Sequence, residues 1–159
     1  MNVTIQPARN TAERDTCARM MSTSEPWITL GRDYSRCLTA VSDPGRELYV
    51  ACAGTDVFGF ILLNMHGPFP GYIQTVCVAD SARGSGIGSQ LVSYAETRIG
   101  RVSPNVFLCV SSFNLGAKRL YERLGYEFVG TLSNFLVDGH DELLFRKTVG
   151  PWSTFTPAG

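Results

Sequence analysis

The sequence predicts an α/β (α+β) fold in which one mixed, mostly antiparallel sheet is flanked by about four helices. Short runs of β-branched and aromatic residues alternate with helical patterns along most of the chain. Residues 72–99 combine a strand, a glycine-rich turn and an amphipathic helix. The 159 residues suffice for one domain with a buried core. We expect this domain to span residues 1–149, followed by a flexible tail over residues 150–159.

Composition and charge narrow the class of protein. Hydrophobic residues make up 44% of the chain and charged residues 18%, which is typical of a globular domain. Lys plus Arg and Asp plus Glu number 14 each, so no cationic excess indicates a nucleic-acid partner. The chain has no long apolar run and no signal-peptide pattern at residues 1–4, so we expect a cytoplasmic protein without a membrane partner.

The five cysteines are scattered along the chain and form no C-x-x-C pair. Their odd number and spacing predict reduced thiols, and neither a disulfide framework nor a metal site. The cysteines are Cys17, Cys37, Cys52, Cys77 and Cys109.

The first half of the chain is predicted to contain an edge strand, two helices and a hairpin. Residues 3–7 alternate like a strand, and Asn10 or Thr11 can cap the helix that follows. Residues 22–26 end this helix, and a second helical stretch is expected to begin at Trp27 and continue to Val41. Residues 47–52 and 57–63 then alternate as two antiparallel strands.

The second half repeats strand and helix. A proline-bracketed loop over residues 66–71 precedes a strand at residues 72–78. The helix after the glycine turn is predicted from apolar residues every fourth position and ends near Gly100. A strand at 107–110, a helix from Asn114 to Leu124, and closing strands at 126–132 and 142–147 complete the chain.

The glycine-rich turn over residues 84–88 predicts an anion site. Glycines let a ligand approach the backbone closely, and a helix N-terminus offers unpaired N–H groups and partial positive charge. Arg83 adds a second cation beside it. A dinucleotide fingerprint would need glycine at Ser89, and a Walker loop would need lysine after Gly88. An ordinary glycine-rich turn is the remaining alternative.

Two motifs carry a family resemblance. Val76-x-Val78 followed by Arg83-x-x-Gly86-x-Gly88 resembles the acyl-CoA pyrophosphate loop of the GCN5-related N-acetyltransferase (GNAT) superfamily. Residues 114–126 are similar to that family's signature N-x-x-A-x-x-L-Y-E-x-x-G-[FY]. The two motifs occur in the family's order and lie within residues 72–130.

The resemblance implies acetyl-CoA as co-substrate, no metal, and a splay beside the central strand that admits the pantetheine arm. It implies that the backbone N–H of Val78 faces the thioester carbonyl and that Tyr121 is the general acid. Helical spacing alone favours core packing for Tyr121. Asn114 can cap the helix, contact the pantetheine arm, or do both. The implied cofactor-binding residues are Val76, Cys77, Val78, Arg83, Gly84, Ser85, Gly86, Ile87, Gly88, Ser89, Asn114 and Lys118.

The general base is not predicted by the motifs. A similar branch, the ribosomal-protein N-terminal acetyltransferases, carries a glutamate five residues before the motif asparagine, where this chain has Cys109. We rank Glu25 first as a replacement. Asp33, His66, His140, Asp141 or a water chain are alternatives. Candidate substrate-binding residues are Trp27, Phe69 and Tyr72, for which core packing or an ordinary hairpin connection is the alternative.

The preferred interpretation is an acetyl-CoA-dependent N-acetyltransferase that acts on a primary amine by direct transfer in a ternary complex. The acceptor would be a small molecule or a protein amino group. The alternative is an acyl-CoA-binding sensor or interaction module with little turnover. A homodimer is a further expectation, because the closing strands commonly pair between subunits in this superfamily.

Overall fold

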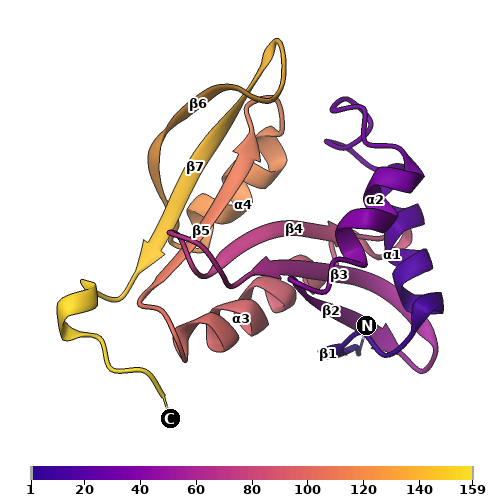
Figure 1. The fold of residues 1–159 in the computed structure, drawn as a ribbon. Helices are drawn as coiled ribbons and strands as arrows, with labels where there is room; N and C mark the ends of the chain where they lie inside the picture. The colour runs from indigo at the N-terminus through magenta and orange to yellow at the C-terminus, as the bar shows by residue number, and fades with distance from the viewer. Residues whose placement is uncertain (1, 159) are drawn as a thin grey trace.

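The computed structural model describes residues 2–158, which form one seven-stranded sheet of order β1-β2-β3-β4-β5-β7-β6 (Figure 1). Neighbouring strands pair antiparallel except β4 and β5, which are parallel. The predicted mixed, mostly antiparallel sheet is therefore confirmed. The strands are β1 (Thr4–Pro7), β2 (Glu47–Ala53), β3 (Asp56–Asn64), β4 (Tyr72–Val78), β5 (Asn105–Ser111), β6 (Glu127–Val137) and β7 (His140–Thr148).

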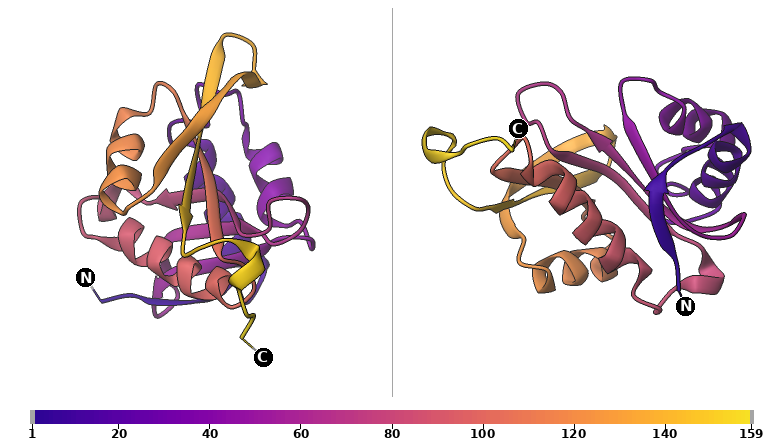
Figure 2. Two further views of the ribbon diagram at one scale, coloured as in Figure 1. Left: turned by 90° about the vertical axis from the view of Figure 1, so that its left-hand side faces the viewer. Right: turned by 90° about the horizontal axis from the view of Figure 1, so that it is seen from below.

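Four α-helices flank the sheet within residues 2–158, as predicted. Helices α1 and α2 cover one face, and α3 packs on the other, with Tyr121 of α4 joining the same core as α3 (Figure 2). None of the helices within this part of the chain has the length and apolar character that crossing a bilayer requires. The helices are α1 (Thr11–Ser22), α2 (Tyr34–Val41), α3 (Ile87–Gly100) and α4 (Leu115–Arg123).

Alternation along the central strands divides the interior into two cores. On β2, Leu48 and Val50 face α1 and α2, whereas Tyr49 and Ala51 face α3. Side chains with a period of two reach both faces of a strand, so strands covered on both faces are apolar throughout. The adjacent strand β3 follows the same rule, which explains its continuous apolar run.

The second helix was predicted to begin at Trp27, and this was wrong. Residues 25–31 form turns, and α2 begins only at Tyr34. Gly31 adopts φ +68°, a left-handed conformation that interrupts a right-handed helix. The carboxylate of Asp33 then accepts a hydrogen bond from the Arg36 N–H at 2.9 Å and caps the new helix.

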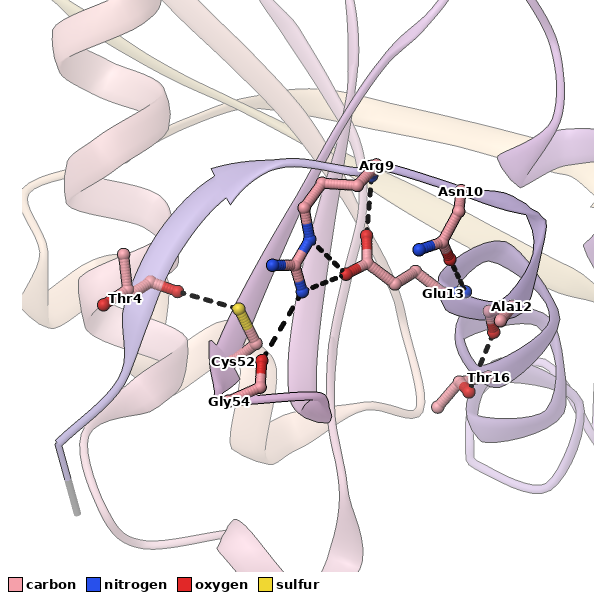
Figure 3. Close-up of polar contacts among 8 residues, drawn as sticks. All are labelled: Thr4, Arg9, Asn10, Ala12, Glu13, Thr16, Cys52 and Gly54. Carbon is pink, nitrogen blue, oxygen red and sulfur yellow. Dashed lines mark hydrogen bonds and ion pairs between the residues drawn. The ribbon is translucent and has the colours of Figure 1, made fainter.

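A partly exposed ion pair joins Glu13 of α1 to Arg9 in the loop after β1 (Figure 3). Glu13 is 5% exposed and accepts hydrogen bonds from the backbone N–H of Arg9 at 2.6 Å and from its guanidinium at 2.7 Å. Burial alone would raise the pKa of Glu13, but these hydrogen bonds lower it below its ordinary value. Asn10 caps the helix by accepting from the Glu13 N–H.

All five cysteines are unpaired, and their reduced state stays a prediction. Cys17, Cys37, Cys52 and Cys77 are buried in the core beneath α1 and α2. The segment after β7 contains a 3₁₀ turn, and the Ala158 N–H donates to the Arg101 carbonyl at 2.9 Å. The flexibility of this tail stays a prediction.

Candidate active site

The sheet opens between β4 and β5. These strands pair only at Tyr72 with Phe107 and Ile73 with Leu108, although both continue beyond this point. They diverge from this closed end, as Figure 1 shows. Gly71 allows the close approach there, since a Cβ atom at Gly71 would lie 2.8 Å from the Asn105 carbonyl oxygen. The predicted splay beside the central strand is confirmed.

One cavity of about 1400 Å³ runs through the splay. On one side it reaches the glycine-rich turn and the start of α4, and on the other the segment between α1 and α2 and the β6–β7 hairpin. A cavity of this size is large for a small-molecule site, and its walls combine apolar side chains with a few polar groups. The arrangement therefore offers two connected compartments.

Strand β4 turns alternate backbone groups toward this cavity. The Ala79 N–H donates to the Phe58 carbonyl of β3 at 2.8 Å. Antiparallel pairing alternates along the strand, so the Cys77 N–H also turns to β3, and those of Val76 and Val78 turn to the splay. Val76, Cys77 and Val78 all line the cavity, and the side chain of Cys77 also packs in the core beneath α1.

The N-terminus of α3 is suited to an anion. Helices α1, α2 and α4 each have a side chain that caps the first turn, but α3 has none. Its first internal hydrogen bond is from Gln90 N–H to Gly86 carbonyl at 3.0 Å, so the N–H groups of the preceding residues lack helical partners. Gly84 and Gly86 adopt φ +75° and +85°, and a Cβ at Gly84 would meet no atom within 4 Å. These residues fit a pyrophosphate group.

The implied cofactor residues are not all brought to the cavity. Arg83 lines it and is paired with Asp80 at 3.0 Å. Asn114 lines it while its Oδ1 accepts from the Ala117 N–H at 3.2 Å, so capping and lining coexist. Ser85 turns its hydroxyl to the Ala82 carbonyl, and Lys118 pairs with Glu122 at 3.8 Å; neither lines the cavity.

Tyr121 contributes to both the core and the cavity. Its side chain is 8% exposed and its ring lies 5.7 Å from that of Tyr126 in an edge-to-face arrangement. Tyr121 lines the cavity, and its hydroxyl forms no hydrogen bond with any of residues 2–158. Burial raises the pKa of Tyr121, so the phenol keeps its proton at neutral pH and is available as a donor.

The predicted base Glu25 and the predicted substrate-binding residues Trp27, Phe69 and Tyr72 all line the cavity. Trp27 also packs against the core beneath α1 and α2, and the Phe69 ring lies 4.9 Å from that of Phe107. The carboxylate of Glu25 is exposed and accepts a hydrogen bond from the Thr29 hydroxyl at 2.6 Å. The other base candidates do not line the cavity: Asp33, His66, His140 and Asp141.

The structure adds a carboxylate that the sequence did not single out. Glu142 of β7 lines the cavity, is 4% exposed, and its Oε2 has no hydrogen-bond partner among residues 2–158. It pairs across the ladder with Ser111, two residues from Cys109 on β5, so all three side chains share one face. Burial raises the pKa of Glu142 above its ordinary value, and Ser111 opposes part of this effect.

A signal for Glu142 exists in the sequence. Alternate residues of the closing strand face opposite sides of the sheet, so Leu143 and Phe145 lie on one face and Glu142 and Leu144 on the other. The sequence thus places Glu142 on the same face as the apolar Leu144. Strand pairing alone decides that this face lines the cavity.

Residues 12–126 match the acetyltransferase (GNAT) family. The chain belongs to this family. It is 33% identical to an uncharacterized N-acetyltransferase of Methanocaldococcus jannaschii over 101 residues, which span 62% of this chain and 64% of that protein. The match thus covers less than two thirds of the relative's length.

Solved structures agree with the GNAT fold. A protein of Desulfovibrio desulfuricans assigned to the GNAT family superposes with a TM-score of 0.79 at 18% identity, covering 94% of this chain and all of that one (100%). An aminoglycoside 6′-N-acetyltransferase complexed with coenzyme A gives 0.75 at 19% identity over 95% and 98% of the two chains. Likeness at this level of identity shows the fold.

The two carboxylates that line the cavity of this GNAT domain differ in environment. Glu25 is exposed and hydrogen-bonded, whereas Glu142 is buried and keeps a free acceptor atom. Within residues 2–158, no group of three or more His, Cys, Asp or Glu side chains is arranged to hold a metal ion.

Proposed function

We propose that this GNAT protein is an acetyl-CoA-dependent N-acetyltransferase that moves an acetyl group to a primary amine by direct transfer in a ternary complex. One observation carries the proposal: a single cavity connects the uncapped N-terminus of α3 with the free carboxylate oxygen of Glu142. The first group suits a pyrophosphate and the second suits an amine. The open β4–β5 splay lies between them.

The residues of the splay would hold and polarise the cofactor. Bound acetyl-CoA supplies the acetyl group as a thioester. The N–H groups at the start of α3 and Arg83 would bind the pyrophosphate, and the Val76 N–H would pair with the pantetheine arm as an added strand does. The Val78 N–H would donate to the thioester oxygen, a contribution of about 2.7–4 kcal/mol to barrier lowering.

Proton transfer is assigned to Glu142 and Tyr121. Glu142 replaces Glu25 as the proposed base, since its Oε2 is free and its raised pKa brings it closer to that of an amine. The amine nitrogen forms the new C–N bond as the C–S bond breaks. Glu142 takes the amine proton, and the Tyr121 hydroxyl gives a proton to the sulfur.

Turnover with purified protein tests the proposal. Acetyl-CoA and a panel of primary amines should give free thiol together with acetylated amine detected by mass spectrometry. Glu142→Gln should lower kcat by about 10²–10⁴-fold, the range for general-base catalysis, without changing coenzyme A affinity. Glu25→Gln is the matched control and should retain most of the turnover.

Two results would contradict the proposal. Coenzyme A binding by calorimetry without thiol release for any amine would indicate the sensor or interaction module instead. Full turnover in Glu142→Gln would remove the assigned base and return that role to another group.

A further inference from the structure

The acceptor compartment is bordered by arginines. Arg32 precedes α2, Arg36 lies in its first turn, and Arg46 precedes β2, and all three line the cavity. Arg46 is engaged, because its Nε donates to the Gln74 side chain at 2.8 Å. Arg32 and Arg36 form no ion pair with any of residues 2–158. Two guanidinium groups are therefore available to a ligand.

The acidic residues that line the cavity differ from each other in environment. Glu25 and Glu142 are the acidic residues among those that line the cavity. Glu25 is exposed and bound by Thr29, whereas Glu142 is buried between β5 and β6 with a free oxygen. The compartment thus has cations on the side of α2 and an unpartnered carboxylate on the side of β7.

Apolar side chains form much of the cavity wall. Leu132 lies directly opposite Glu142 on the β6–β7 ladder, and aromatic side chains stand on both sides of the cavity. Apolar walls exclude water, and this strengthens the attraction between a charged side chain and an oppositely charged group of the ligand. It also raises the free-energy cost of a charged group that is left without a partner. The apolar lining residues here are Trp27, Leu30, Phe69, Leu132, Phe135 and Leu136.

We infer that the acceptor is a small primary amine that also carries an anionic group, a carboxylate or a phosphate. The amine lies at Glu142 and the anionic group at Arg32 and Arg36. This inference rests on the proposed N-acetyltransferase function and narrows its substrate class. Arginine suits the anionic end, since its planar fork binds carboxylate and phosphate oxygens in pairs. A polycation such as an aminoglycoside would meet the same arginines with repulsion.

Matched amines test the charge preference. L-phenylalanine is compared with L-phenylalaninamide, and O-phosphoethanolamine with ethanolamine, by kcat/KM for acetyl transfer. We expect the anionic member of at least one pair to be preferred by about tenfold to a hundredfold, the worth of charge-assisted hydrogen bonds. The pair that shows the preference distinguishes a carboxylate from a phosphate.

Substitution of the arginines adds a second readout. The double variant Arg32→Gln/Arg36→Gln should raise KM for the anionic amine by about tenfold or more, with kcat nearly unchanged and no loss for its neutral partner. Arg119→Gln is the control, because Arg119 is exposed on α4 and does not line the cavity. Melting temperatures verify that both proteins are folded.

The outcomes separate the two proposals. Equal or better turnover of the neutral amines, or of kanamycin or spermidine, overturns the acceptor class and leaves the N-acetyltransferase function intact. An unchanged preference in the double variant overturns the assignment to Arg32 and Arg36. Binding of coenzyme A without acetyl transfer to any amine in the panel overturns both proposals.

Discussion

At the scale of single residues, Tyr121 combines a packed ring with an unpaired hydroxyl. The ring fills part of the core between α4 and the sheet, while the residue lines the cavity. Packing and proton donation use different atoms of the side chain, so the two interpretations that the sequence left open do not compete. Because the hydroxyl has no hydrogen bond within residues 2–158, its removal should cost little stability.

Replacing Tyr121 with Phe separates these roles. Turnover should fall by about 10²–10⁴-fold, because the variant cannot donate the proton. The ring and its packing are retained. Melting temperature and coenzyme A affinity should stay near those of the unmodified protein. Tyr121→Ala is the comparison, and should lower the free energy of unfolding by about 3–5 kcal/mol, as large aromatic truncations do. Normal turnover in Tyr121→Phe would exclude the general-acid role.

Glu142 is a second residue at which function opposes stability. A buried carboxylate without a partner keeps a costly desolvated group in the folded state. Burial raises its pKa in the folded protein, so the folded state binds this proton more tightly than the unfolded state does. Stability from this group is therefore present at low pH and is lost as pH rises above the unfolded pKa.

Glu142→Gln should raise the free energy of unfolding by an amount that depends on pH. At pH 8 the variant should be more stable than the unmodified protein by about 1–3 kcal/mol, the cost of an unsatisfied buried polar group. The difference should shrink toward pH 4, where Glu142 is largely protonated in both states. Urea unfolding at several pH values measures it. Glu25→Gln, at an exposed carboxylate, should show no such trend, and a Glu142→Gln variant that is less stable at pH 8 would contradict the argument.

At the scale of elements, α3 differs from the other α-helices in how its first turn begins, and this difference marks the cofactor side of the cavity. Three helices begin with a capping side chain, and α3 begins with glycines at positive φ. A cap would occupy the N–H groups that a phosphate needs. Gly88 lies in this first turn, and a Cβ there would meet Val78 Cγ2 at 3.7 Å, an ordinary contact.

Gly88→Asp should therefore separate binding from folding. The new carboxylate would repel the pyrophosphate and compete for the same N–H groups, lowering coenzyme A affinity by about tenfold or more. The melting temperature should be unchanged or raised, because an acidic residue in the first turn favours the helix dipole. Thr97→Asp, at an exposed position further along α3, is the matched control. Unchanged affinity measured by calorimetry in Gly88→Asp would move the cofactor site elsewhere.

At the scale of the whole molecule, the site depends on the division of the sheet. Strands β1 to β4 carry α1 and α2 on one face, whereas β5, β7 and β6 continue beyond the splay (Figure 2). The cavity takes its cofactor side from α3 and α4 and its acceptor side from the α1–α2 segment and the β6–β7 hairpin. The strand β6 is an edge of the sheet and exposes Phe128 and Val129. The homodimer stays a prediction.

The sequence by itself determined the family, the order of strands and helices, the glycine turn and the position of Tyr121. These features are local, because strand alternation, helix periodicity and a turn are each specified by residues close together in the chain. Local patterns also misled, since the mostly apolar residues 27–30 resemble a helix start. The left-handed Gly31 interrupts this helix, and Asp33 caps the one that begins after it. Tertiary structure alone placed Glu142 opposite Ser111 and set Arg32 and Arg36 on the wall of the same cavity. Strand register and burial arise from contacts between distant segments, and they decide which carboxylate is left without a partner.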